Sequence, residues 1–87
     1  MSSVDYHAIV TAAYRRSFPD EIIDEDSDFF ELGGDSLTVV SMCAHIEELV
    51  GFTLPPSILM YQPTVAELAN ALPTISRTSL NENSETE

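Results

Sequence analysis

The sequence is poor in positive charge, and this scarcity narrows the classes of possible partner. Three arginines and no lysine stand against fifteen Asp and Glu residues, which gives a formal net charge of −12. We expect neither nucleic acid nor a membrane as partner, because nucleic acid and anionic lipid would both be repelled. A basic protein surface is the natural complement, although acidic charge also serves simply to keep a small protein soluble.

The sequence also lacks a second cysteine and a long apolar run, and it is too short to form two lobes with a catalytic cleft between them. Cys43 alone cannot form an intramolecular disulfide, and its apolar helical surroundings predict a small core residue. No apolar run approaches the roughly 20 residues that span a bilayer, and no basic region followed by an apolar run begins the chain. We therefore expect a cytoplasmic protein. Its 87 residues predict one domain with a modest core.

What the sequence does contain is a series of apolar residues at helical spacing. The segments with this spacing are residues 2–18, residues 36–50, one or two turns between Pro56 and Pro63, and residues 64–72. Ser2 or Ser3 would cap the first of these helices. Together these four segments predict an all-α fold, a small four-helix bundle with three principal helices and a short third helix. A long loop would connect helices 1 and 2. We expect a monomer.

The last predicted helix has clear signals at both ends. Thr64 and Glu67 have the spacing of a capping box at its start, and Pro73 would end it. The polar stretch that follows cannot bury enough surface to offset its ordering entropy. We therefore expect a folded domain over residues 1–73 and a disordered acidic tail over residues 74–87.

The helix predicted over residues 36–50 carries two separate groups of apolar residues. One stripe, which predicts the side facing the core, comprises Val39, Met42, Cys43, Ile46 and Val50. Leu37, Val40 and Ala44 gather on a different side, near Glu48. Packing one face inward does not explain this second group.

The long stretch between the first two helices, residues 19–35, is strongly acidic. It holds eight of the fifteen acidic residues: Asp20, Glu21, Asp24, Glu25, Asp26, Asp28, Glu31 and Asp35. Positions 1, 3, 5 and 12 of a calcium loop would fall on Asp24, Asp26, Asp28 and Asp35. However, Phe29 stands where that loop needs glycine, and Asp35 is shorter than the glutamate it needs, so we expect no metal site. Interspersed apolar residues predict an ordered loop pinned to the core.

Hydrolase chemistry has no support in the sequence. Ser36 and His45 lie nine residues apart on one predicted helix, which separates their backbones by about 13 Å. That separation is far beyond hydrogen-bond reach, so the two residues cannot form a catalytic pair. The segment GGDSL also lacks the G-x-S-x-G pattern of a nucleophile elbow, and no strand precedes it.

The segment LGGDSL, residues 32–37, places a serine at the start of the strongest helix. Asp35 is a good N-cap, which leaves the hydroxyl of Ser36 free of that task. Gly33 and Gly34 allow a tight approach of the loop and keep bulk away from the hydroxyl. The helix start also favours an attached phosphate. On local chemistry alone, Ser36 is either an attachment point or simply the first residue of a helix.

The stretch DFFELGGDSL, residues 28–37, resembles the phosphopantetheine attachment motif of acyl and peptidyl carrier proteins. The resemblance continues through IEELVGFTLP and YQPTVAELANAL and covers roughly residues 5–72. It implies a four-helix bundle with a short third helix. It further implies that a phosphopantetheinyl transferase uses coenzyme A to attach 4′-phosphopantetheine covalently to Ser36, beside Gly34 and Asp35, and that the protein is not itself an enzyme.

The same resemblance implies a role for the second apolar group on helix 2. The arm would carry acyl or aminoacyl intermediates as thioesters to several enzymes. Leu37, Val40 and Ala44, with Glu48, would form a docking patch for these partners. They would be loading enzymes (adenylation or acyltransferase), condensing enzymes and release enzymes, each with a basic docking surface.

The residues just after the serine indicate which carriers the chain resembles most. Thr38, Val39 and Ser41 stand where fatty-acid carriers tend to be more acidic, and the LGG triplet replaces a more variable dipeptide. Both features resemble carriers of nonribosomal peptide or polyketide biosynthesis. The alternatives are a fatty-acid-type acyl carrier and a non-carrying interaction module of the same fold.

Overall fold

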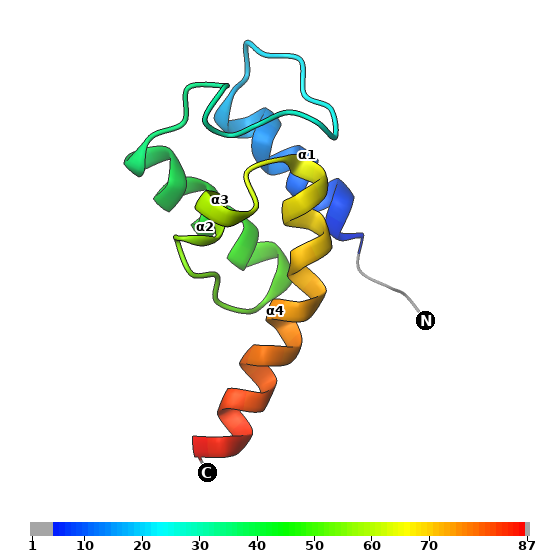
Figure 1. The fold of residues 1–87 in the computed structure, drawn as a ribbon, viewed down its shortest axis with the longest axis vertical. Helices are drawn as coiled ribbons and strands as arrows, with labels where there is room; N and C mark the ends of the chain where they lie inside the picture. The colour runs from blue at the N-terminus through cyan, green and yellow to red at the C-terminus, as the bar shows by residue number, and fades with distance from the viewer. Residues whose placement is uncertain (1–4, 87) are drawn as a thin grey trace.

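The structure is a computed structural model that describes the backbone of residues 5–86 and the side chains of residues 5–76. It contains α1 (Tyr6–Ser17), α2 (Ser36–Val50), α3 (Ile58–Tyr61) and α4 (Val65–Thr86), and α1 packs against both α2 and α4 (Figure 1). No strand lies within residues 5–86, and no helix among them is long and apolar enough to cross a membrane. The predicted all-α bundle, with its short third helix and its long loop between α1 and α2, is confirmed.

The first helix begins at a different cap from the one predicted. Asp5 is the N-cap of α1, and its Oδ1 accepts a hydrogen bond from the backbone N–H of Ala8 at 3.0 Å. The prediction of a serine cap is therefore wrong, and Ser2 and Ser3 lie outside the described residues. An aspartate at this position also places negative charge at the positive end of the helix.

The core is built from one apolar face of each helix and from the loops between them. Its largest fully buried side chains are Tyr14, Phe29, Met42, Ile46, Leu59, Leu68, Leu72, Val10 and Val65. The stripe predicted for α2 is confirmed, because Met42, Cys43 and Ile46 are buried and Val39 and Val50 pack against the edge of the core. Burial raises the pKa of the Cys43 thiol to about 11, which fits a core residue and not a reactive thiol.

The long loop between α1 and α2 is anchored in the core, as predicted. Ile23 and Phe29 are its buried apolar residues. The backbone N–H of Phe29 donates to the carbonyl of Pro63 at 2.8 Å, and the Tyr14 hydroxyl donates to the same carbonyl. Burial raises the pKa of Tyr14, so its hydroxyl remains a donor. One carbonyl before α4 thus joins α1 and the loop.

The same loop satisfies the first turn of α4. The backbone N–H of Val65 donates to the carbonyl of Ser27 at 3.2 Å, and the N–H of Ala66 donates to the carbonyl of Glu25 at 3.1 Å. The first N–H groups of a helix have no partner within the helix. Loop carbonyls supply these partners here, and the contact fixes the loop against α4.

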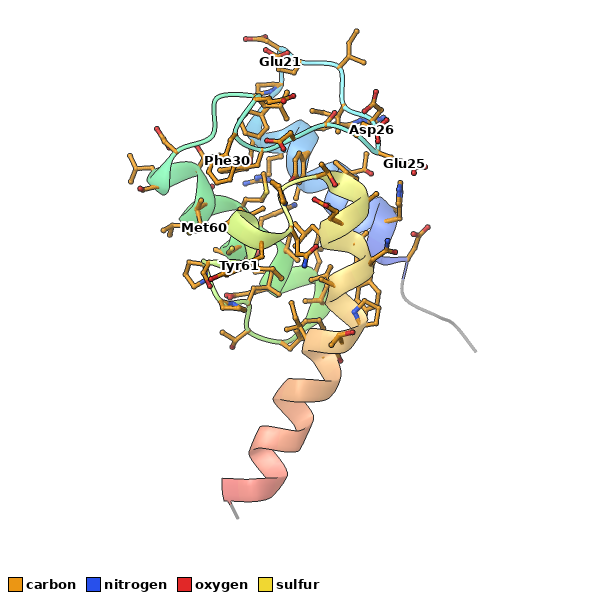
Figure 2. All side chains as sticks on the ribbon, in the orientation of Figure 1. Glu21, Glu25, Asp26, Phe30, Met60 and Tyr61 are labelled. Carbon is orange, nitrogen blue, oxygen red and sulfur yellow. The ribbon has the colours of Figure 1, made fainter. Side chains whose placement is uncertain are left out.

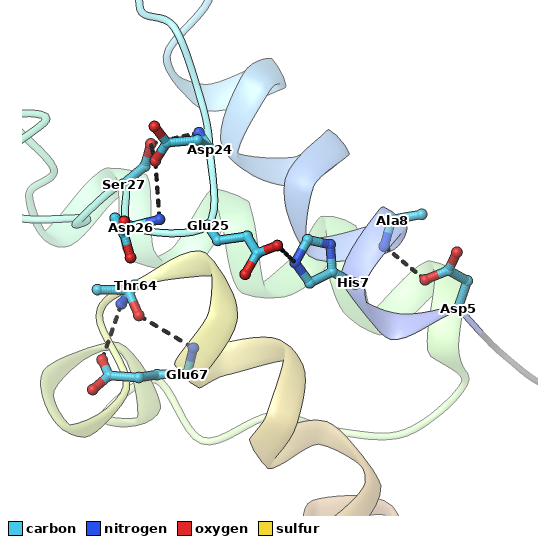
Figure 3. Close-up of polar contacts among 9 residues, drawn as sticks. All are labelled: Asp5, His7, Ala8, Asp24, Glu25, Asp26, Ser27, Thr64 and Glu67. Atoms are coloured by element: carbon cyan, nitrogen blue, oxygen red, sulfur yellow. Dashed lines mark hydrogen bonds and ion pairs between the residues drawn. The ribbon is translucent and has the colours of Figure 1, made fainter.

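The fourth helix starts as predicted but does not end where predicted. Thr64 and Glu67 form the reciprocal capping box (Figure 3). The backbone N–H of Thr64 donates to Glu67 Oε1 at 3.3 Å, and the backbone N–H of Glu67 donates to Thr64 Oγ1 at 3.2 Å. The prediction that Pro73 ends this helix is wrong, because α4 continues through Pro73 to Thr86. Ile75 extends the apolar stripe and packs against the core, so tertiary packing outweighs the cost of the proline. A domain boundary at residue 73 stays a prediction.

Candidate functional site

Ser36 is the first residue of α2, and Asp35 serves as the N-cap in its place. Asp35 Oδ1 accepts from the backbone N–H of Thr38 at 3.0 Å and from the Thr38 hydroxyl at 2.9 Å. The Ser36 side chain is exposed and has no hydrogen-bond partner among residues 5–76. The prediction that Asp35 caps the helix is confirmed, and the Ser36 hydroxyl is available to an enzyme approaching from solvent.

The charge of Asp35 is stabilised by the helix start. The backbone N–H of Thr38, and then its hydroxyl, hold the pKa of the Asp35 carboxyl below its ordinary value of 3.8. Because the pKa is lower in the folded state, the ionised carboxylate stabilises the fold at pH values above the ordinary pKa of the group. That contribution is lost as the pH falls through the folded value.

A Thr38→Val variant tests this capping interaction. It removes the hydroxyl donor and keeps the backbone donor, so we expect the pKa of Asp35 to rise toward 3.8 without reaching it. We also expect acid unfolding to begin at a higher pH than in the parent chain. A carbon-13 NMR titration of the Asp35 carboxyl measures the pKa directly. An unchanged value would contradict the assignment of the hydroxyl as a donor.

The two glycines before the cap have different physical roles. Gly33 has φ +94°, a backbone conformation that side chains disfavour, and a Cβ added there would meet no atom within 4 Å. A Cβ at Gly34 would lie 2.3 Å from Cε2 and Cζ of the buried Phe29 ring. The tight approach predicted for the loop is therefore made by Gly34 against Phe29. Positive φ, rather than clearance around the serine hydroxyl, explains glycine at Gly33.

An open, mostly apolar groove of ≈ 560 Å³ runs beside Ser36. Its lining residues are Phe30, Asp35, Ser36, Val39, Val40, Pro56, Ser57 and Met60. Figure 2 labels Phe30 on the loop and Met60 on α3, both on the side of the molecule where α2 begins. Sequence reasoning missed Phe30 and Met60 as neighbours of the serine. The two adjacent phenylalanines were the available signal, since successive side chains of an extended chain point to opposite sides.

The predicted docking residues of α2 are all exposed. Leu37 and Val40 are 80% and 62% exposed, and Ala44 and Glu48 also lie on the surface. The neighbouring Glu47 is partly buried. Its Oε2 accepts from the backbone N–H of Leu54 at 2.8 Å, so it holds the segment after α2.

The acidic loop uses its carboxylates to form turns. Asp24 Oδ1 accepts from the N–H of Asp26 at 2.9 Å, and Asp28 Oδ1 accepts from the N–H groups of Phe30 and Glu31 (Figure 3 shows the Asp24 turn). Such turns are a usual role of aspartate in loops. Among the described residues, no group of three or more His, Cys, Asp or Glu side chains is placed to hold a metal ion.

Comparison with known families places this site within a recognised domain. Residues 9–72 match the family described as "Phosphopantetheine attachment site". The chain is 38% identical over 64 residues to erythronolide synthase EryA3 of Saccharopolyspora erythraea. That match covers 74% of the chain and 2% of the synthase, so the chain spans only a small part of its relative's length.

Solved structures of carrier proteins agree with the fold. BlmI, a type II acyl carrier protein from Streptomyces verticillus, superposes with a TM-score of 0.74 over 80% of this chain and 84% of its own, at 23% identity. A free-standing peptidyl carrier protein from Acinetobacter baumannii superposes with a TM-score of 0.71 at 30% identity, over 79% of this chain and 89% of its own. Members of the family carry covalently attached 4′-phosphopantetheine and do not themselves catalyse reactions. The chain therefore belongs to the phosphopantetheine attachment-site family, as a carrier domain of the polyketide and nonribosomal peptide type.

Proposed function

We propose that Ser36 is the attachment point of 4′-phosphopantetheine, which a phosphopantetheinyl transferase delivers from coenzyme A. The observation that carries this proposal is the exposed Ser36 hydroxyl, which is left without a hydrogen-bond partner because Asp35 performs the capping. The start of α2 also favours the negative charge of a phosphodiester. Asp35 and Gly34 act by holding Ser36 at this position.

The residues around Ser36 can accommodate the attached group. In the transfer, a bond forms between Ser36 Oγ and the phosphorus of the pantetheine phosphate. The hydroxyl proton leaves, and the adenosine bisphosphate part of coenzyme A is the leaving group. When bound, the arm supplies a terminal thiol that can hold an acyl or aminoacyl group as a thioester. The apolar groove beside Ser36 offers the arm a surface to follow.

We assign partner docking to the exposed face of α2 beside the serine. Leu37, Val40 and Ala44 supply apolar contact area, and Glu48 supplies negative charge at the edge. The net charge of −12 favours partners with basic rims around an apolar patch. Such partners are the transferase, loading enzymes (adenylation or acyltransferase), condensing enzymes and release enzymes. The proposal places a monomeric carrier in the cytoplasm.

The residues after Ser36 favour a nonribosomal peptide or polyketide pathway. Thr38, Val39 and Ser41 give α2 no acidic residue in its first turns, unlike the pattern typical of fatty-acid carriers. The similar proteins include an erythronolide synthase and a peptidyl carrier protein. The carried group can therefore be acyl or aminoacyl on this argument.

Transfer of phosphopantetheine to the purified protein tests the proposal. Apo protein, coenzyme A, Mg²⁺ and a transferase of broad specificity are combined and then analysed by intact-protein mass spectrometry. We expect the mass to rise by one phosphopantetheine, and peptide mapping to locate the change in the peptide that contains Ser36. An unchanged mass under conditions that modify a known carrier would instead support a non-carrying interaction module of the same fold.

A further inference from the structure

Another groove, of ≈ 410 Å³, lies between α1 and the long acidic loop, and we call it the α1 groove. Its α1 wall is formed by His7, Ala8, Thr11, Ala12 and Arg15, and its loop wall by Ile23, Asp24 and Glu25. His7 Nε2 lies 3.7 Å from Glu25 Oε2, which brings the two walls together near the start of α1 (Figure 3). The backbone bonds from the loop to α4 hold the loop wall in place. The function proposed above makes no use of this groove.

The α1 wall of the groove consists largely of small side chains. Ala8 and Ala12 lie about one helical turn apart and are both exposed. Small side chains at a contact allow a second helix to approach closely. From His7 to Arg15 the wall rises by about 12 Å, or about two helical turns. These dimensions fit one helix of a partner, with small or apolar residues facing α1.

The two walls offer charges of opposite sign to such a helix. The guanidinium of Arg15 has no ion pair or hydrogen bond to any described side chain, although the chain contains fifteen acidic residues. Asp24 and Glu25 are exposed on the loop wall. A matching helix has a carboxylate on the edge that faces Arg15 and basic residues on the edge that faces the loop. The net charge of −12 also favours a helix with more basic than acidic residues.

The α1 groove and the groove beside Ser36 lie on different sides of the molecule. The two grooves share no lining residue. Figure 2 labels Glu25 on one side of the ribbon, and Phe30 and Met60 on the other. A helix in the α1 groove therefore leaves Ser36 and the exposed face of α2 open to solvent.

We propose that the α1 groove binds an amphipathic helix of a partner protein, and that this partner stays bound while enzymes act at Ser36. The first part stands on the groove alone, whereas the second part rests on the proposed attachment at Ser36. Arg15 and Glu25 set the orientation of the helix, because each attracts the opposite charge at one of its edges. A partner linked to one of the enzymes would keep the carrier at a high effective concentration near it.

A synthetic helical peptide of about 18 residues serves as the probe, since much shorter helices are only marginally stable in water. Alanines form the face that enters the groove, a glutamate lies on one edge, and lysines lie on the other edge. The peptide is titrated into nitrogen-15-labelled protein at low salt, where ion pairs at a surface are least screened. We expect the backbone NMR signals of Ala8, Ala12 and Ile23 to shift, and those of Ser36 and Val40 to stay in place.

Arg15 and Arg16 provide a matched pair of charge reversals. Both are exposed in the last turn of α1, but only Arg15 lines the groove. Long-range attraction alone predicts that either reversal strengthens binding of the basic peptide, because each makes the protein more acidic. Pairing in the groove predicts that Arg15→Glu weakens binding by about fivefold, whereas Arg16→Glu does not weaken it. A peptide whose glutamate is replaced by lysine should restore binding to the Arg15→Glu protein.

Glu25 and Glu21 provide a second matched pair, on the loop. Both are exposed and both are labelled in Figure 2, but only Glu25 lines the groove. Glu25→Gln removes the side-chain charge and keeps the backbone carbonyl that accepts from the N–H of Ala66, so the loop stays bonded to α4. We expect Glu25→Gln to weaken peptide binding by about threefold, and Glu21→Gln to have the smaller effect.

The outcomes separate this inference from the proposed function. An absence of shifts, or shifts confined to Ser36 and Val40, would overturn the inference and leave the proposed function standing. Transfer of phosphopantetheine at an unchanged initial rate with saturating peptide would support simultaneous binding, and blocked transfer would contradict it. A protein that gains no mass without peptide would overturn the proposed function and only the second part of the inference. Signals of Ala8 and Ala12 that move when the protein alone is diluted would show that a second copy fills the groove, and the inference would be wrong.

Discussion

A Ser36→Ala variant is expected to fold normally and to gain no phosphopantetheine. Alanine is the best helix former, and Asp35 continues to cap α2 through Thr38, so the bundle should keep its stability. The only atom removed is the hydroxyl oxygen that the transferase would modify. The expected loss is therefore complete rather than partial. Intact-protein mass spectrometry after incubation with coenzyme A and the transferase measures it.

Ser57 provides the matched control for this experiment. It is the other hydroxyl that lines the same groove, and it is also exposed. We expect Ser57→Ala to be modified as the parent chain is. Modification that persists in Ser36→Ala, or that is lost in Ser57→Ala, would move the attachment point and contradict the assignment. Circular dichroism of both variants checks that α2 remains helical.

A Gly34→Ala variant is expected to lose about 1–3 kcal/mol of folding free energy, the usual cost of overpacking a core. The added Cβ would lie 2.3 Å from the Phe29 ring, which is fully buried and cannot swing into solvent. The loop must then move, and with it Asp35 and Ser36. We therefore also expect slower transfer of phosphopantetheine. Urea unfolding measures the stability, and the initial rate of mass gain measures the transfer.

Two further variants isolate the clash as the cause. Combining Gly34→Ala with Phe29→Leu should cost less than the sum of the two single changes, because the smaller side chain makes room for the methyl group. Gly33→Asn should cost less than Gly34→Ala, since no atom lies within 4 Å of its Cβ and asparagine tolerates positive φ. Strict additivity in the first pair would show that the ring is not the obstacle.

Much of the site could be predicted because its determinants are local. Asp35 lies next to Ser36 in sequence, so the assignment of the cap to one and of the free hydroxyl to the other needed only the start of a helix. The exposed positions of Leu37, Val40 and Ala44 followed from helical geometry in the same way. The inward-facing stripe that contains Met42 and Ile46 could also be predicted from helical geometry.

The features that could not be predicted depend on contacts between distant segments. Pro73 indicates a helix end, but the contact of Ile75 with the core keeps α4 helical beyond it. Glu47 resembles any surface acid until the chain turns back and presents the N–H of Leu54. The groove beside Ser36 needs Phe30 from the loop and Met60 from α3, and neither position follows from local spacing.

The backbone bonds between the loop and the start of α4 also bear on when the site can form during synthesis. Residues 25–29 precede the serine, and they are held by residues 63–66, which a ribosome makes nearly forty positions later. Contacts of such sequence separation form late in folding because a long segment must first be closed. A chain that ends before Thr64 lacks the start of α4, whose N–H groups bond to the carbonyls of residues 25 and 27 in the loop before Ser36. On the proposed attachment at Ser36, we therefore expect the transferase to modify the chain efficiently only after α4 has been synthesised.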